Sequence, residues 1–191
     1  MRPFYRTVTL IVCLAWVGTA LAPAAHAAAV KGKARKPRMV LYAPTTYDRV
    51  AVLLHKGKEQ KYYLFSRENP AKLELQGPTT LAVNVRLLYD VAMKGAQNFT
   101  IAVEENGMLG KRSEVASYSF TAQKSPVSTF KGEAEVVPSK AQKFKLEVPS
   151  GIHRYTISLR NTAASAAAIR ILIPKKDINP APQPAPKEKQ K

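Results

Sequence analysis

The chain has 191 residues, 46% of them hydrophobic, which suits one folded domain with additional segments. Its formal net charge of +17 bears on association with acidic partners and says little about the fold. The single cysteine, Cys13, lies in the predicted targeting segment, so the mature chain has no disulfide, no cysteine nucleophile and no cysteine-based metal site.

Residues 1–27 have the layout of a secretory signal peptide. Arg2 and Arg6 flank the start of the chain, an apolar run follows over 7–22, and a small-residue Ala-His-Ala site ends it at 25–27. The 16-residue run is shorter than the roughly 20 residues that a membrane-spanning helix needs. We therefore predict cleavage after Ala27, no transmembrane span in the mature chain, and export to the periplasm, the cell surface or the exterior of a bacterium.

Basic segments flank the predicted domain. Residues 28–38 contain five basic residues and no acidic one, which is typical of a disordered arm. Residues 175–191 contain five lysines, two acidic residues and four prolines at alternate positions, which predicts an extended, disordered tail. The domain between them, 39–174, holds 18 basic and 11 acidic residues. Arm and tail together therefore carry +8 of the +15 of the mature chain.

Within 39–174, short runs with period-two hydrophobicity alternate with turn signals, as in strands that bury one face. The clearest run carries Leu81, Val83, Val85 and Leu87, and Gly77-Pro78 is expected to separate it from the run before. The predicted strands are 39–42, 49–55, 60–67, 72–76, 80–89, 98–104, 112–122, 143–148, 154–160 and 167–173.

The connections between these runs add detail. Asn106-Gly107 predicts a hairpin, and Pro149-Ser150-Gly151 a turn. The run 60–67 is apolar on both faces, so it is either covered twice or lies at an edge under a loop. Residues 124–139 form a polar crossing with one short strand at 132–137. The pattern predicts an all-β fold, a two-sheet antiparallel sandwich of Greek-key or jelly-roll type with eight to ten short strands.

Three phrases carry a resemblance to a known group of proteins. They are Glu74-Leu75-Gln76-Gly77-Pro78 leading into the strand 81–86, the turn at 104–107, and the Pro-Ser-Gly-Ile-His-Arg-Tyr sequence at 149–155. Over about 60–170 the chain resembles uncharacterised bacterial exported β-sandwich proteins. The resemblance concerns the residues at which the strands begin and end, and it implies no activity.

No catalytic arrangement is recognised. The mature chain has two histidines, His55 at a strand end and His153 in a turn, and neither has a nucleophile motif beside it. Metal-ligand spacing and phosphate-binding loops are absent from the sequence, so we expect no catalytic residues, no metal and no cofactor. The protein is predicted not to be an enzyme, and a hydrolase with an unrecognised site is the weakest alternative.

Two sets of side chains are candidates for binding. Outward positions of the last three strands hold five basic residues that would attract an anionic polymer. These possible anion-binding residues are Lys143, Lys145, Arg154, Arg160 and Arg170. The alternative is that they form a solvated face that protects the sheet against aggregation. A second set would provide stacking surfaces for sugars. These possible glycan-stacking residues are Tyr42, Tyr47, Tyr62 and Tyr63.

The sequence therefore predicts a non-catalytic exported protein that works by interaction. Its expected partners are an anionic polysaccharide, lipopolysaccharide or an envelope protein, bound through the basic ends and the basic sheet face. The lack of aromatic residues among the basic ones argues against nucleic acid. The alternative function is a carbohydrate-binding β-sandwich module. Arg86 and Asp90, four residues apart, are expected to pair if their strand runs straight.

Overall fold

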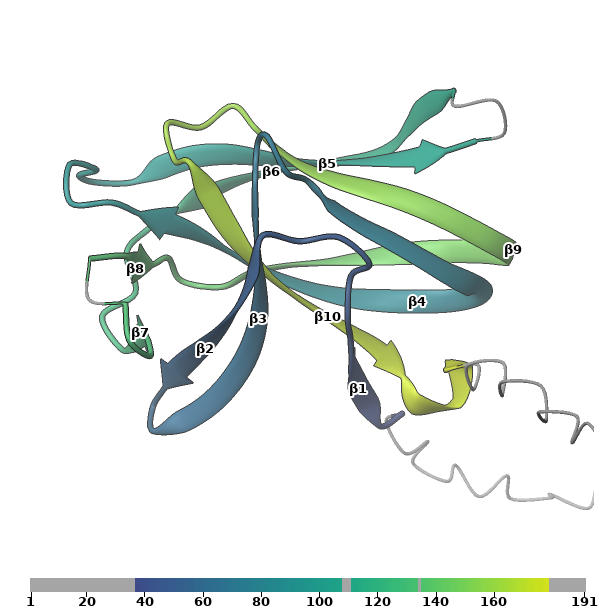
Figure 1. Cartoon of the computed structure of the whole chain (residues 1–191), viewed down its shortest axis with the longest axis horizontal. Helices are drawn as coiled ribbons and strands as arrows, with labels where there is room; N and C mark the ends of the chain where they lie inside the picture. Colours follow the sequence, from purple (N-terminus) through teal and green to yellow (C-terminus); the bar gives the residue numbers. More distant parts are fainter. Residues whose placement is uncertain (1–36, 108–110, 134, 179–191) are drawn as a thin grey trace, which may run out of the picture. The chain divides into compact units, whose positions relative to one another are not determined.

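The computed structural model describes residues 37–107, 111–133 and 135–178 (Figure 1). These residues form an antiparallel all-β structure, and the fold-class prediction of an all-β sandwich-like architecture is confirmed. The strands are β1 (Met39–Tyr42), β2 (Arg49–His55), β3 (Lys58–Ser66), β4 (Ala71–Tyr89), β5 (Gln97–Asn106), β6 (Arg112–Ala122), β7 (Ser128–Phe130), β8 (Val137–Pro138), β9 (Gln142–Arg160) and β10 (Ala166–Pro174).

All ten strands belong to one sheet, in the order β6-β5-β9-β4-β10-β3-β2-β7, with β1 paired to β10 and β8 paired to β4. Strands β4 and β9 are each 19 residues long and pair along almost their whole length. The N-terminal half of each lies against the C-terminal half of the other. This ribbon therefore belongs to both halves of the sheet and connects them (Figure 1).

The predicted breaks at Gly77-Pro78 and Pro149-Ser150-Gly151 are wrong, because both strands continue through them. The register shifts between Gly77 and Thr79, where the partner strand has one additional residue. Buried positions in β9 consequently change from even numbers (Phe144, Leu146) to odd numbers after the bend. The glycines and prolines bend a continuous ribbon here and do not end it, because the partner strand supplies hydrogen bonds on both sides of the bulge.

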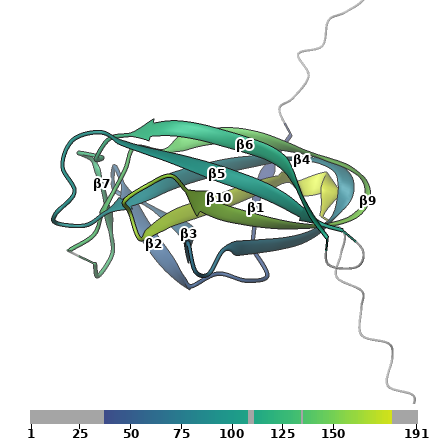
Figure 2. The same cartoon turned by 90° about the horizontal axis from the view of Figure 1, so that it is seen from above.

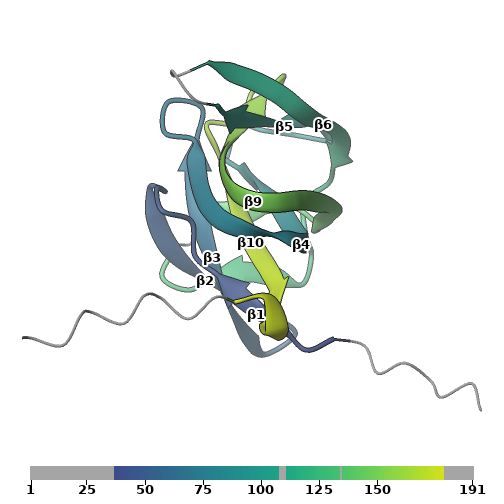
Figure 3. The same cartoon turned by 90° about the vertical axis from the view of Figure 1, so that its right-hand side faces the viewer.

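The two halves of the sheet enclose the main hydrophobic core. Figure 3 shows β5 and β6 on one side and β2 and β3 on the other, with β4 and β9 between them. Tyr118 of β6 stacks on Phe144 of β9 at a centroid distance of 4.2 Å, and its hydroxyl donates to the carbonyl of Lys145 at 2.8 Å. The inward residues of the clearest predicted strand, Leu81 and Val83 among them, are buried in this core as expected.

A second, smaller core covers part of the outer face of the other half. Tyr63 of β3 faces the main core, whereas Tyr62 and Leu64 face the second core with Leu88 and Phe130. Of the two alternatives for 60–67, cover on both faces is therefore the one that the structure shows. The cover comes from the crossing at 123–141, which contains β7 and β8 in place of the single strand predicted at 132–137. Two short pairings form because β2 and β4 offer different free edges to the crossing chain.

The hairpin at Asn106-Gly107 is confirmed by the pairing of β5 with β6, which Figure 2 shows side by side. Arg86 and Asp90 do not pair, contrary to expectation. β4 ends at Tyr89, and Asp90 instead accepts a hydrogen bond from the backbone N–H of Met93 at 2.9 Å.

The predictions for the signal peptide at 1–27, most of the arm at 28–38 and most of the tail at 175–191 lie outside the described residues. The first residues of the predicted tail, Lys175–Asp177, form one 3₁₀ turn directly after β10.

Candidate functional site: a basic groove on the outer sheet face

A groove of about 570 Å³ lies on the outer face of the sheet, beside the second core. Its floor comes from β3, β4, β9 and β10, and its rim from the β2–β3 turn and the crossing chain. The crossing chain covers the hydrophobic part of this face and leaves the polar part open. The cationic residues of the groove are Lys56, Arg86, Lys140, Lys143 and Arg170. The polar neutral residues with them are Gln60, Tyr62, Asn84 and Ser125, and His55 joins them at the rim.

The register of three strands positions the charged floor. Asn84 of β4 pairs with Lys143 of β9 on one side and with Arg170 of β10 on the other. Arg86, two residues further along β4, points to the same face. Arg86 and Arg170 are diagonal neighbours on the adjacent strands β4 and β10. The backbone positions of such neighbours are about 7–8 Å apart, so long side chains can reach across. Three basic residues therefore occupy positions next to Asn84 on the same face of the sheet.

Arg86 is the most deeply buried of these cations, with 4% of its surface exposed. Its Nη1 donates to the carbonyl of Ser139 at 2.6 Å, and its Nε donates to the hydroxyl of Tyr62 at 3.3 Å. The guanidinium also lies 5.9 Å from the centre of the Tyr62 ring. These contacts hold the side chain in one orientation, but none of them neutralises its charge.

The charge of the groove is unmatched. No carboxylate lines it, and none of its five cations forms an ion pair with any described residue. As a scale for such repulsion, two unit charges separated by about 8 Å, the spacing of diagonal positions on neighbouring strands, repel each other by roughly 2 kcal/mol at an effective dielectric constant of about 20. No described residue lines the groove with a counterion that would offset this repulsion.

Several carboxylates of the described residues form ion pairs outside the groove. Arg154 donates from Nε to Glu74 at 3.0 Å, and this contact holds the pKa of the Glu74 carboxyl below its usual value. Arg160 forms ion pairs with Glu104 and Glu114. These two arginines, predicted to be part of the anion-binding set, lie in the β9 segment that pairs with β5 and with the first half of β4. Their charges are thus locally compensated.

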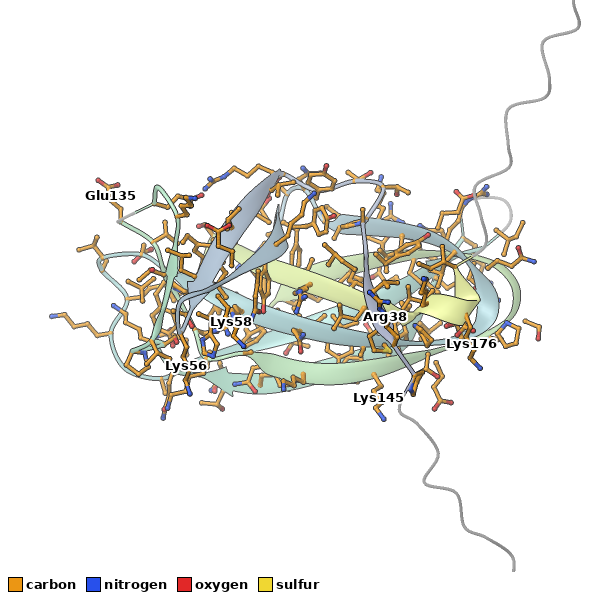
Figure 4. All side chains as sticks on the ribbon, turned by 90° about the horizontal axis from the view of Figure 1, so that it is seen from below. Arg38, Lys56, Lys58, Glu135, Lys145 and Lys176 are labelled. Carbon is orange, nitrogen blue, oxygen red and sulfur yellow. The ribbon has the colours of Figure 1, made fainter. Side chains whose placement is uncertain are left out.

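The predicted anion-binding set is therefore divided by the fold. Lys143 and Arg170 line the groove, and Lys145 is exposed one outward position further along β9. Figure 4 shows Lys145 on the same side of the molecule as Lys56, at some distance along it. Anion binding by these five residues stays a prediction. Lys143 and Arg170, which flank Asn84 in the groove, are the two of the five that the fold brings together there.

The four tyrosines do not form one exposed surface. Tyr62 and Tyr63 are 1% and 3% exposed and face opposite cores. Tyr47 is half-buried and packs against Tyr63 with ring centroids 4.9 Å apart. Tyr42 is half-buried, and its hydroxyl donates to the carbonyl of Glu74. Of the four, Tyr62 alone is a groove residue, contributing beside Arg86.

The two histidines lie in different places. His55 is on the groove rim, with Nδ1 2.7 Å from the hydroxyl of Ser128, which is 2% exposed and so is shielded from a substrate. His153 lies just after the β9 bend, where its Nδ1 is 2.6 Å from a carboxylate oxygen of Glu105. That hydrogen bond is the main reason why the pKa of His153 is raised, while partial burial lowers it.

Sequence reasoning did not include Lys56, Arg86, Lys140, Asn84 or Gln60 in the site. For Arg86 a signal was present in the sequence. It is a charged residue in the middle of a strand whose inward residues are all apolar and form part of the core. Lys56 lines the groove only because of the position of the β2–β3 turn, and Lys140 only because of the path of the crossing chain.

Comparison with known proteins gives little further information. No protein-family model and no curated protein matches the chain. Among solved structures it is similar to the Clostridium thermocellum N-terminal endo-1,4-β-D-xylanase 10B, CBM22-1–GH10 modules complexed with xylohexaose. The sequence identity is 12% and the TM-score 0.32, over 71% of this chain and 25% of that one. The chain thus spans about a quarter of that protein's length, and a likeness at this level carries no argument about function.

The described residues contain neither a membrane-spanning helix nor a cluster of metal ligands. None of their helices is long and apolar enough to cross a membrane. Nor do three or more His, Cys, Asp or Glu side chains within the described ranges gather where a metal ion could be held.

Proposed function

We propose that this protein is an exported, non-catalytic binding protein whose basic groove takes an anionic polymer of the cell envelope. The observation that carries the proposal is the gathering of five cations in one groove to which the described residues contribute no carboxylate. The signal-peptide pattern at 1–27 supports export, and the basic segments at both ends of the mature chain would add long-range attraction.

The groove is suited to binding because one cation of its floor, Arg86, is already held in place. Arg86 is held by Ser139 and Tyr62 before any ligand arrives, so little side-chain entropy is lost on binding. Asn84 and Gln60 supply neutral donors and acceptors that fit sugar hydroxyls beside an acidic group. An acidic polysaccharide therefore matches the groove better than a neutral one.

The test is a titration of the mature chain with two polyanions, alginate and polyphosphate, and with neutral dextran. We expect both polyanions to bind and dextran not to bind. The Lys140→Gln/Lys143→Gln variant should weaken polyanion binding by about tenfold or more, since each lost contact to a charged group is worth about 0.7 kcal/mol or more.

The matched control is the Lys72→Gln/Lys94→Gln variant, which removes the same charge from exposed positions outside the groove. It should change the affinity by less than about threefold, the effect of general attraction alone. Equal losses in the two variants would show that net charge, and not the groove, drives association. Deleting 28–38 and 175–191 measures the contribution of the basic ends.

A neutral carbohydrate-binding module is the second candidate. The half-buried Tyr42 and Tyr47 are the observation in its favour, since Tyr62 and Tyr63 are engaged in the cores. Binding of neutral glycans that is lost in the Tyr42→Ala or Tyr47→Ala variant would favour this function over the anionic one. A turnover abolished by His55→Ala or His153→Ala would instead support the hydrolase alternative.

A further inference from the structure

The floor of the groove contains two guanidinium groups with unused hydrogen-bonding capacity. Arg86 uses Nη1 and Nε for Ser139 and Tyr62, and its Nη2 has no partner among the described residues. Arg170 has no partner among them for any of its nitrogens, including an Nε that is shielded from solvent. A buried N–H group without a partner destabilises the structure unless a ligand or water supplies an acceptor.

These two groups approach the space above Asn84 from different strands. Arg86 lies on β4, Arg170 on β10, and Lys143 on β9 at the opposite side of Asn84. Because all of these residues line the groove, their donors face the same space from three strands. The register relation that places Arg86 diagonally opposite Arg170 suits a single anion bridging both side chains.

We propose that this part of the groove is a subsite for a tetrahedral oxyanion, a phosphoryl or sulfo group carried by the polymer. The inference rests on the proposed function and specifies its ligand. A carboxylate has two coplanar oxygens, which one guanidinium fork satisfies. A phosphoryl or sulfo group offers three oxygens in different directions and so has an acceptor for each of Arg86, Arg170 and Lys143. The amide of Asn84 is left for the adjoining hydroxyl of the ligand.

The experiment compares inorganic phosphate, sulfate and acetate at constant pH and ionic strength, followed by NMR of the arginine Nε–H signals in the mature chain. We expect phosphate or sulfate to bind at least tenfold more tightly than acetate and to shift the Arg86 and Arg170 signals. Tighter binding of phosphate than of sulfate would identify a phosphoryl ligand. Equal binding of phosphate and sulfate would show that the subsite recognises the tetrahedral shape of the anion. Acetate binding as tightly as the better of the two overturns the inference.

Variants that replace a guanidinium group with a lysine ammonium group keep the positive charge and provide a second test. Arg170→Lys should weaken binding of the preferred oxyanion about tenfold and leave alginate binding within twofold. Arg38→Lys, at an exposed position outside the groove, is the matched control and should change neither. Arg86→Lys is expected to act like Arg170→Lys, provided that its melting temperature shows a folded protein. Unchanged oxyanion binding in Arg170→Lys overturns the inference.

The two proposals fail in different ways. If neither polyphosphate nor alginate binds, the proposed function is wrong. If both bind equally and the small oxyanions show no preference over acetate, the function stands and the oxyanion subsite does not.

Discussion

At the scale of one residue, we expect the positive charge of Arg170 to lower the stability of the fold. Arg170 lines the same groove as Arg86 and Lys143, its Nε has no partner among the described residues, and none of those residues supplies a carboxylate to the groove. Replacing it with Met keeps the aliphatic packing and removes the repulsion. We expect Arg170→Met to raise stability by about 1 kcal/mol, which is a melting temperature about 3–5 °C higher, while anion binding is lost.

Thermal unfolding at low ionic strength without added phosphate measures this effect. Arg154→Met is the informative comparison, because Arg154 has a carboxylate partner in Glu74. It should leave the melting temperature unchanged or slightly lower. A lower melting temperature for Arg170→Met would contradict the view that the groove is strained by its own charge.

His153 gives the protein a pH-dependent contact. Its hydrogen bond with Glu105 raises the pKa of the folded-state imidazole above its usual value of 6.5. The contact therefore stabilises the fold fully below pH 6.5 and progressively less as pH rises through the folded-state pKa, provided that Glu105 is ionised. We expect stability to fall with rising pH across this window, and His153→Gln to flatten that slope.

Urea unfolding at a series of pH values above and below 6.5 tests the contact. His55→Gln serves as the control, since His55 lies beside the hydroxyl of Ser128 and not beside a carboxylate. That control should keep the slope. A slope that persists in His153→Gln would assign the pH dependence to another group.

The bend of the β4–β9 ribbon is the decisive feature at the scale of elements. A Cβ atom added at Gly77 would collide with the carbonyl oxygen of Pro149 on the paired strand. Since both are backbone positions in a continuous ladder, neither can move without disturbing the pairing. We expect Gly77→Ala to destabilise the protein by at least about 2 kcal/mol.

Chemical unfolding of Gly77→Ala, or its soluble yield if it does not fold, measures this loss. Gly107→Ala is the control, because a Cβ atom there would come no closer than 3.3 Å to the carbonyl oxygen of Lys111. It should cost no more than about 1 kcal/mol, a usual value for a substitution of this kind. Equal effects would mean that the close approach at the bend is not important.

For the whole molecule, the notable property is where positive charge is compensated. Among the described residues, ion pairs lie outside the groove, at Arg154 and Arg160 for example, while the groove has none. Binding of a polyanion should consequently weaken steeply as salt rises, because counterions are released on association. We expect the slope of log Kd against log salt concentration to be smaller in Lys140→Gln/Lys143→Gln than in Lys72→Gln/Lys94→Gln. Equal slopes would indicate that both regions contact the ligand equally.

Much of the fold could be predicted from local patterns. Period-two hydrophobicity located most strands, and Asn-Gly located the β5–β6 hairpin, because both signals depend on neighbouring residues alone. The continuity of β4 and β9 could not be predicted in this way. Gly77-Pro78 usually ends a strand, and only the distant partner at 148–151 makes the ribbon continue there.

The candidate site was predicted less completely, since its residues come from five parts of the chain. Outward position in a strand identified Lys143 and Arg170, but it also selected Arg154 and Arg160. Their carboxylate partners are distant in sequence, 80 residues away for Arg154 and 46 and 56 residues away for Arg160. Charge compensation of this kind depends on register, which no local pattern contains.

The amino-acid sequence alone establishes the excess of positive charge, the alternation that makes the chain an all-β protein, and the buried side of most of the predicted strands. The tertiary structure decides which cations remain without a counterion. It does so because the bent ribbon directs Arg154 and Arg160 toward carboxylates, and because the crossing chain encloses Arg86, Lys143 and Arg170 in a groove that has none.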